Sequence, residues 1–254
     1  MSVLGISLKE SKEEQELYRL ICDNQTPIII GIGDAGTGKT MCSVATALQL
    51  VLDKKYNQII YTRNPVEVGK SLGFLKGGLE SKFGPYTAPL YDTLEAICHH
   101  STNKLNQSDL AAKIEVEPLG FLRGRSFAPG TILIVDEAQN LNLASLKTVM
   151  TRMSDYCKVI LLGSMNQIDD YDQRRKDKCD FQKVIDKFRD SQCPYAGIVE
   201  LKTSMRSKWC AYVDALLSEI DKPFAFEPEY EVSKEEKGIQ ATWGDGEHEG
   251  TFTL

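Results

Sequence analysis

The chain has 254 residues, of which 42% are hydrophobic and 26% charged, and its formal net charge is −6. This length suits one large domain, or one domain with a tail, and the apolar fraction is enough to fill a core. No apolar run approaches the ~18 residues of a membrane span, and the first ten residues lack the basic start and apolar centre of a secretory signal. The seven cysteines include no C-x-x-C pair, so we expect reduced thiols in a cytoplasmic protein, without disulfides or a zinc site.

The negative charge is concentrated at the C-terminal end. Of the total of −6, residues 222–254 contribute −5, from three lysines and eight acidic residues, which leaves −1 for residues 1–221. The body therefore lacks the basic charge of a general nucleic-acid binder, and any such contact would depend on local patches. We expect residues 1–221 to form a single domain and residues 222–254 to form an acidic, mobile tail.

Hydrophobic periodicity predicts an alternation of helices and strands. Residues 8–22 carry apolar side chains at helical spacing among many charges, which is typical of a surface helix and places a helix in the N-terminal segment 1–24. Further along the chain we expect strands at 27–32, 57–62, 113–117, 131–136, 158–163 and 197–201, and helices at 40–52, 86–100, 143–153, 181–189 and 207–220. This order predicts an α/β fold with a mostly parallel central sheet.

The stretch from Gly33 to Thr40 (GDAGTGKT) fits the pattern G-x-x-x-x-G-K-[ST] and stands between a predicted strand and a predicted helix. Its glycines let successive N–H groups point into one nest, and the start of the helix adds the positive end of its dipole. Lys39 adds a charge for the outer phosphates of a nucleotide, and Thr40 is placed to offer its hydroxyl to Mg²⁺. The stretch therefore predicts a phosphate-binding loop.

Polar side chains follow two of the predicted strands. Asp136 and Glu137 come at the end of the strand 131–136, and ligands of open α/β sheets lie at that carboxyl edge. We expect Asp136 to hold Mg²⁺ through water and Glu137 to position and deprotonate an attacking water. Gln167, after the next strand, is placed to sense the γ-phosphate. Alone, each could be a solvated residue at a strand end, and the neighbouring loop favours the catalytic interpretation.

Two segments could contact a polymer or a neighbouring subunit. Residues 69–84 contain five glycines, which argue against regular structure, and apolar residues that argue against disorder. They could equally form a packed lid. The basic run at 174–178 is a second candidate, although such runs are most often solvated surfaces.

Taken together, these residues resemble the PhoH-like family of P-loop ATPases, whose core is similar to the first ATPase domain of superfamily 1 helicases. The resemblance covers residues 25–217 and is carried by GDAGTGKT, TRNPVEVGKSLGFL, PYTAPLYDTL, EVEPLGFLRGRSF, ILIVDEAQN, TRM and GSMNQID. It implies a RecA-like three-layer sandwich with an insert, residues 64–128, between the nucleotide motifs. The sequence departs from the family pattern at Ser164, where an aspartate is usual, and at Lys76, where a proline is common. Ser164 removes an acid that could order the water or metal shell.

The resemblance also implies roles for residues outside the loop. Gln25 would approach the adenine, Arg63 would belong to the motif after the second strand, and Arg206 would reach a neighbour's nucleotide. The residues that we expect to contact ATP are Gln25, Gly33, Asp34, Ala35, Gly36, Thr37, Gly38, Lys39, Thr40, Met41 and Arg63. Those that we expect to act in catalysis are Lys39, Asp136, Glu137, Gln167 and Arg206, with Thr40 and Asp136 as metal ligands.

The leading hypothesis is Mg²⁺-dependent ATP hydrolysis. A superfamily 1 motor encloses ATP between two tandem domains, whereas one such domain accounts for residues 25–217 here. We therefore expect a homo-oligomeric ring, with a hexamer suggested by the resemblance, in which a second copy closes the site. Three alternatives stay open: a helicase or translocase on single-stranded RNA or DNA, a small-molecule phosphotransferase, and a nucleotide-binding scaffold that hydrolyses little. No membrane partner is expected.

Overall fold

The computed structural model describes residues 2–8, 11–63, 79–122, 124–165 and 179–205, with residues 209, 212, 213, 216, 240–244 and 249–253 beyond them. The chain divides into two compact units, Met1–Arg206 and Ser207–Leu254. In the second unit, β9 (Gln240–Gly244) and β10 (Glu249–Thr253) pair as an antiparallel hairpin, which the sequence patterns did not predict. Most of the helix expected at 207–220 lies outside the described residues.

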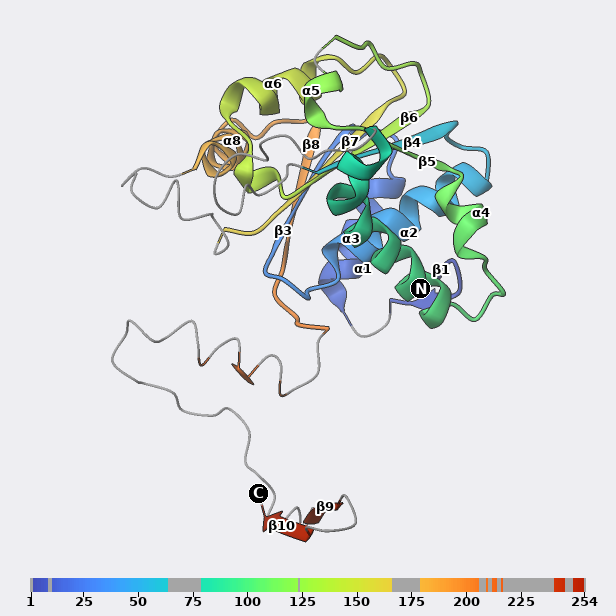
Figure 1. The fold of residues 1–254 in the computed structure, drawn as a ribbon. Helices are drawn as coiled ribbons and strands as arrows, with labels where there is room; N and C mark the ends of the chain where they lie inside the picture. The colour runs from blue at the N-terminus through green and yellow to red at the C-terminus, as the bar shows by residue number, and fades with distance from the viewer. Residues whose placement is uncertain are drawn as a thin grey trace. The chain divides into compact units, whose positions relative to one another are not determined.

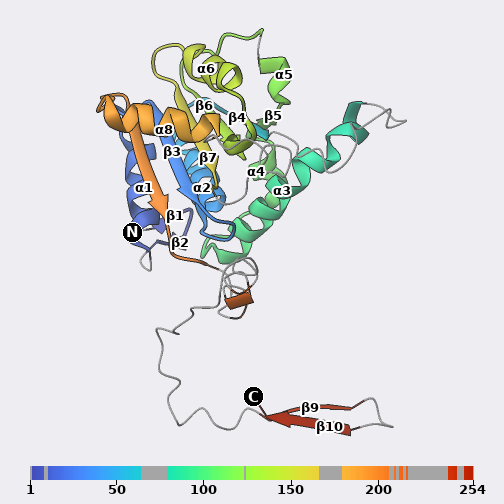
Figure 2. The ribbon, with the colours of Figure 1, turned by 90° about the vertical axis from the view of Figure 1, so that its left-hand side faces the viewer.

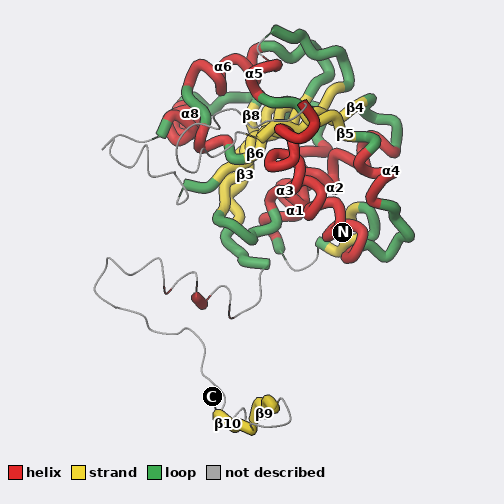
Figure 3. The backbone as a smooth tube through the Cα atoms, viewed as in Figure 1, coloured by secondary structure: helices red, strands yellow, loops and turns green. Residues whose placement is uncertain are grey.

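A six-stranded sheet forms the centre of the first unit, and all of its neighbouring strands are parallel. The strand order is β5 (Ile114–Val116), β4 (Gln58–Arg63), β6 (Thr131–Asp136), β7 (Lys158–Gly163), β3 (Ile28–Gly33) and β8 (Ala196–Leu201). One face packs against α1 (Lys12–Cys22), α2 (Lys39–Leu52) and α3 (Leu79–His100), and the other against α6 (Leu143–Thr151) and α8 (Asp180–Asp190) (Figures 1 and 3). The predicted three-layer α/β fold is confirmed.

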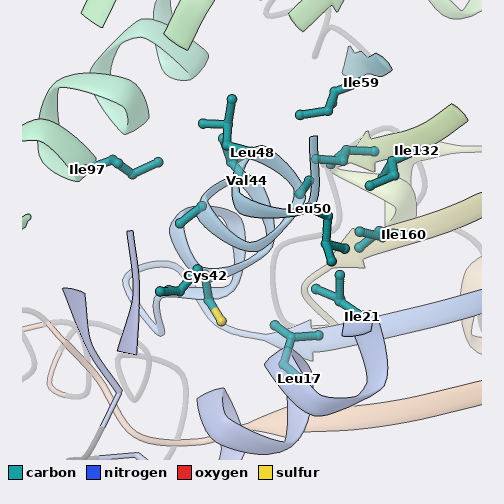
Figure 4. Packing of buried hydrophobic residues seen from close by; sticks show 14 of the residues in the cluster. Leu17, Ile21, Cys42, Val44, Leu48, Leu50, Ile59, Ile97, Ile132 and Ile160 are labelled. Carbon is teal, nitrogen blue, oxygen red and sulfur yellow. The ribbon is translucent and has the colours of Figure 1, made fainter. Parts of the chain in front are cut away.

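The side chains of the central strands alternate between two cores, because successive residues of a strand point to opposite faces. On β6, Ile132 and Ile134 belong to the core with α1 and α2, whereas Leu133 and Val135 belong to the core with α6 and α8. Figure 4 shows the first core. The helices α1 and α2 contribute the side chains of Leu17, Ile21, Cys42, Val44, Leu48 and Leu50 to it. Because α2 is buried over most of its length, packing fixes the helix that follows the phosphate loop.

The helix α3 differs from its predicted form. It begins at Leu79 and includes Gly84 and Pro85, although the glycines predicted no regular structure over 69–84 and a helix start after Pro85. The buried residues that anchor it, Leu90, Leu94 and Ile97, lie in its second half. The N-terminal end of α3 extends away from the sheet (Figure 2). Its residues have weak helix propensity, and they are helical because they continue a helix that packing holds at its other end.

Hydrophobic periodicity did not predict five short elements, because each spans less than two helical turns or only two strand residues. They are β1 (Ser2–Val3), β2 (Ile6–Ser7), α4 (Gln107–Ala111), α5 (Leu119–Leu122) and the 3₁₀ turn η1 (Ala138–Asn140). Among the described residues, no helix has the length and apolar character needed to span a membrane.

Candidate nucleotide site

The phosphate loop connects β3 to α2 at the carboxyl edge of the sheet. Gly36 and Gly38 have φ angles of 83° and 78°, in the left-handed region that favours glycine. A Cβ on Gly38 would overlap with the carboxylate of Glu14 on α1, and one on Gly33 would lie 2.7 Å from the carbonyl oxygen of Leu201. Backbone conformation and close packing therefore both require glycine in this loop.

Hydrogen bonds from within the loop and from outside it hold the loop in shape. The Thr37 hydroxyl donates to the carbonyl oxygen of Asp34 at 2.9 Å, within the loop itself. From outside, the backbone amide of Met205 donates to the carbonyl oxygen of Gly36 at 2.7 Å. The segment that follows β8 thus returns to the loop, a long-range contact that no local pattern in the sequence signals.

Lys39 is the first residue of α2, and its side chain turns back over the loop. Its Nζ donates to the carbonyl oxygen of Asp34 at 3.2 Å, and the residue is only 8% exposed. Burial lowers the pKa of this lysine, while the carboxylates of Asp136, Glu137 and Asp34 oppose the shift. The ammonium group therefore lies among acids, at the position from which the sequence predicted contact with outer phosphates.

The two predicted metal ligands lie close together. Thr40 Oγ1 is 3.4 Å from Oδ1 of Asp136, which is the last residue of β6 and 3% exposed. The other oxygen, Oδ2, accepts a hydrogen bond from the Tyr61 hydroxyl at 2.7 Å and lies 3.8 Å from Nη1 of Arg63. Burial raises the pKa of Asp136, and the Tyr61 hydrogen bond acts against this shift. A cation at this carboxylate would offset the desolvation of its charge.

The oxygen ligands of this pair suit Mg²⁺, which usually binds one or two carboxylates and completes its octahedral shell with phosphates and water. Over the described ranges of the chain, no group of three or more His, Cys, Asp or Glu side chains could hold a metal ion. Thr40 and Asp136 are the candidate ligands at this site, and phosphate oxygens and water would complete the shell of a bound ion.

Glu137 follows Asp136 in the left-handed conformation, with φ 53° and ψ 43°, which is uncommon for a residue with a Cβ. Both of its carboxylate oxygens accept hydrogen bonds. Oε1 accepts from Nη2 of Arg63 at 3.0 Å, and Oε2 accepts from Nε2 of Gln139 at 2.6 Å. The turn after β6 thus places the predicted base within reach of β4, where Arg63 contacts both acids.

The structure does not bring Gln25 into this group. It lies in an exposed turn before the amino end of β3, and its amide donates to the Asp23 side chain at 3.0 Å. The six residues of β3 separate this turn from the phosphate loop, a distance of about 20 Å at the rise of a parallel strand. The contact with adenine that the resemblance implies for Gln25 stays a prediction.

Several predicted residues lie outside the described part of the chain. They are Gln167, Arg206 and Lys76, with the segments 64–78 and 174–178. In the RGRSF segment, Arg125 forms ion pairs with Glu115, at 3.1 Å, and with Glu117. Its charge is therefore balanced within the insert.

Sequence reasoning missed three residues of the site. Tyr61 sits inside an apolar strand and looks like a core residue. Gln139 stands two residues after Glu137, and the sequence gives it no signal beyond its place in the motif ILIVDEAQN. Ser164 differs from the family pattern, and its hydroxyl donates to Asp34 Oδ1 at 3.0 Å. Only the register of β4, β6 and β7 reveals these contacts.

The comparisons with known proteins agree with the motifs. A family model described as PhoH-like protein matches residues 7–216. The PhoH-like protein of Bacillus subtilis (strain 168) is 41% identical over 143 residues, covering 56% of this chain and 44% of the relative. Protein PhoH of Escherichia coli (strain K12) is 34% identical over 159 residues, covering 63% of this chain and 45% of the relative. The chain thus spans less than half the length of these relatives.

Among solved structures, the fold is similar to that of the Pif1 helicase from Candida albicans, with a TM-score of 0.41 and 14% identity over 84% of this chain and 44% of that one. The family model covers most of the chain, and the range that it matches includes the residues of the site described above. This protein therefore belongs to the PhoH-like family of P-loop NTPases, which implies that it binds a nucleotide.

Proposed function

We propose that this chain is a Mg²⁺-dependent ATPase. One observation carries the proposal: residues 96 positions apart in the sequence, Thr40 and Asp136, meet at 3.4 Å beside the buried ammonium group of Lys39. Phosphate-binding and metal-binding groups therefore face one place at the carboxyl edge of the sheet. Hydrolysis, as distinct from binding, rests on Glu137, whose carboxylate stands next to this pair.

Each residue has a role in this reaction. The loop amides and Lys39 neutralise the outer phosphates, with the phosphate replacing the Asp34 carbonyl as the partner of Nζ. Thr40 and Asp136 would hold Mg²⁺, which would supply positive charge beside the phosphates. Glu137 takes the proton of the attacking water as the water oxygen bonds to the γ-phosphorus and the bond to the bridging oxygen breaks.

Glu137 needs a free oxygen for that step. Both of its oxygens accept hydrogen bonds, so one donor must move before a water molecule can occupy its place. Arg63 is the better candidate, because its guanidinium also lies near Asp136 and would be attracted by an incoming phosphate. We therefore expect Arg63 to exchange carboxylate contacts for phosphate contacts when ATP binds.

The test is steady-state phosphate release from ATP by the purified chain. We expect release that requires Mg²⁺, is lost with EDTA and is lost in Asp136→Asn. Asp92→Asn, at an exposed position of α3, is the matched control and should release phosphate normally. Binding of ATP without phosphate release by the unchanged protein would contradict the proposal and favour the scaffold alternative.

We also propose that copies of the chain assemble head to tail into a ring, with Arg206 of one copy completing the site of the next. The family resemblance suggests a hexamer. We expect specific activity to fall on dilution and Arg206→Ala to release phosphate slowly at every concentration. Constant activity on dilution together with normal turnover of Arg206→Ala would rule out a shared site.

Coupling to single-stranded RNA or DNA is the second finer proposal, through the glycine-rich segment 69–84 and the basic run 174–178. We expect single-stranded RNA or DNA to stimulate phosphate release, and the stimulation to weaken steeply as salt is raised. A release rate that is the same with and without either polymer would contradict it.

A further inference from the structure

A row of polar side chains joins the phosphate loop to Glu137. Ser164, the first residue after β7, donates its hydroxyl to Oδ1 of Asp34 at 3.0 Å. Its backbone amide donates to Oε1 of Gln139 at 3.1 Å, and Nε2 of Gln139 donates to Oε2 of Glu137 at 2.6 Å. Three consecutive hydrogen bonds thus connect a residue of the loop with the proposed base.

The chemistry of these partners fixes the orientation of the Gln139 amide. The backbone N–H of Ser164 can only donate, so the oxygen of Gln139 must face it. The nitrogen of Gln139 then faces the carboxylate of Glu137, which can only accept when ionised. Reversing the amide would lose both hydrogen bonds.

Packing holds the same arrangement in place. Ser164 and Gln139 are 1% and 3% exposed, so water does not compete freely for their hydrogen bonds. A Cβ on Gly163 would lie 2.9 Å from Oε1 of Gln139 and 2.6 Å from Cε1 of Phe181. Only glycine at position 163 leaves room for Gln139 between β7 and α8.

We propose that Asp34, Ser164 and Gln139 form a positioning relay, which sets the orientation of Glu137 according to the shape of the phosphate loop. The inference rests on the proposed ATPase function and deepens it. Gln139 acts through Glu137, and Asp34 takes part through its side chain. A loop that closes on phosphates moves the Asp34 carboxylate, and the relay passes this displacement to the base.

The relay also accounts for the departure at position 164. An aspartate there would bring a second carboxylate against that of Asp34, and two carboxylates at this distance repel each other. Serine supplies a donor instead. The acid near the loop is therefore provided by Asp34, and Ser164 holds it.

The first test is Gln139→Met, which keeps the length of the side chain and removes both hydrogen bonds. We expect kcat to fall about 10- to 100-fold, the effect of a lost hydrogen bond to a charged group, with KM for ATP changed by less than about 2-fold. A purely structural role would instead lower the folded fraction and leave kcat per folded molecule unchanged.

The matched control is Gln182→Met. Gln182 lies on α8 and also donates to a carboxylate, that of Asp186, at 2.7 Å. The substitution removes the same kind of hydrogen bond away from the site, so kcat and KM for ATP should stay as in the unchanged protein. Thermal unfolding of each variant reports whether it is folded.

A double-mutant cycle tests the other end of the relay. Asp34→Ala and Ser164→Ala break the same hydrogen bond, so each should lower kcat and the double variant should lower it no further than the more severe single one. Ser43→Ala is the control, since the Ser43 hydroxyl is buried and has no hydrogen-bond partner among the described residues. The cycle decides the question even if Gln139→Met does not fold.

The outcomes separate this inference from the function on which it rests. No phosphate release by the unchanged protein would overturn both. Release that persists at the normal rate in folded Gln139→Met would overturn the relay alone. Additive effects in the Asp34–Ser164 cycle would also overturn it.

Discussion

Two buried lysines lie at opposite ends of the same parallel sheet. Lys39 follows β3 at the carboxyl edge, and Lys158 begins β7 at the amino edge. Burial lowers the pKa of both, to about 8 for Lys158. Their partners differ, because Lys158 donates to the carbonyl oxygens of Asp23 and Thr26 at 2.6 and 2.8 Å, whereas Lys39 has one carbonyl partner at 3.2 Å.

This difference separates a structural lysine from a functional one. The two carbonyls at Lys158 belong to the turn that leads into β3, so the ammonium group pins that turn to the neighbouring strand β7. Lys39 holds its single carbonyl in a loop surrounded by carboxylates, and a phosphate can replace that carbonyl. Burial and a lowered pKa are common to both residues, and only the partners identify the site.

The comparison predicts its largest effect for Lys39→Ala. Loss of the ammonium group removes the charge that neutralises the outer phosphates, so phosphate release should fall by about 10³-fold or more and ATP binding should be lost. The free energy of unfolding should change little. Phosphate-release and ATP-binding assays measure this, with Lys147→Ala on the exposed face of α6 as the control. Unchanged activity in Lys39→Ala would show that the two lysines do not differ in function.

Glu137→Gln should have the next largest effect. The amide cannot accept the proton of the attacking water, so turnover should fall about 10²-fold or more while ATP still binds. Single-turnover assays and equilibrium binding distinguish the two steps. Glu95→Gln, at an exposed position of α3, is the matched control. Parallel losses of binding and turnover would instead place Glu137 among the binding residues.

Lys158→Met should have the opposite profile to Lys39→Ala. It leaves the carbonyls of Asp23 and Thr26 without their donor, so the free energy of unfolding should fall by about 1–3 kcal/mol. The kcat for ATP should stay within about 2-fold of the unchanged protein, because the residue lies at the other edge of the sheet. Denaturant unfolding measures the first quantity. A stable but inactive variant would contradict the structural role.

The last prediction is a dependence of stability on pH, which changes the free energy of unfolding and leaves the site untouched. The pKa of Lys158 is lowered from its ordinary value of 10.5 to about 8, so between these values the unfolded chain binds a proton that the folded chain does not. Stability from this residue should therefore rise as pH increases from 8 to 10.5. Unfolding free energies of the unchanged protein and Lys158→Met should diverge over this window. A constant difference would contradict the shift.

The sequence predicted the first unit well because its signals are local. Long β-branched runs, such as the one ending at Asp136, specify buried parallel strands, and the glycine pattern at 33–40 specifies the loop. Since the carboxyl ends of parallel strands share one edge, the meeting of Lys39, Thr40 and Asp136 followed from the order of elements alone.

What the sequence could not show depends on register and on side-chain direction. The positions of Tyr61, Gln139 and Ser164 follow from the register of β4, β6 and β7, and no sequence pattern specifies that register. The predicted start of α3 was wrong, because glycine and proline indicate a local backbone preference, whereas packing of the second half of the helix decides where it begins.

The bond between the amide of Met205 and the carbonyl oxygen of Gly36 links the loop to the end of the first unit. The loop cannot change its curvature at Gly36 without either moving Met205 or breaking this bond. Met205 is 42% exposed, so a fluorophore attached at this position is accessible. The fluorescence of a label at residue 205 should therefore report whether the loop is occupied, with no label on the nucleotide.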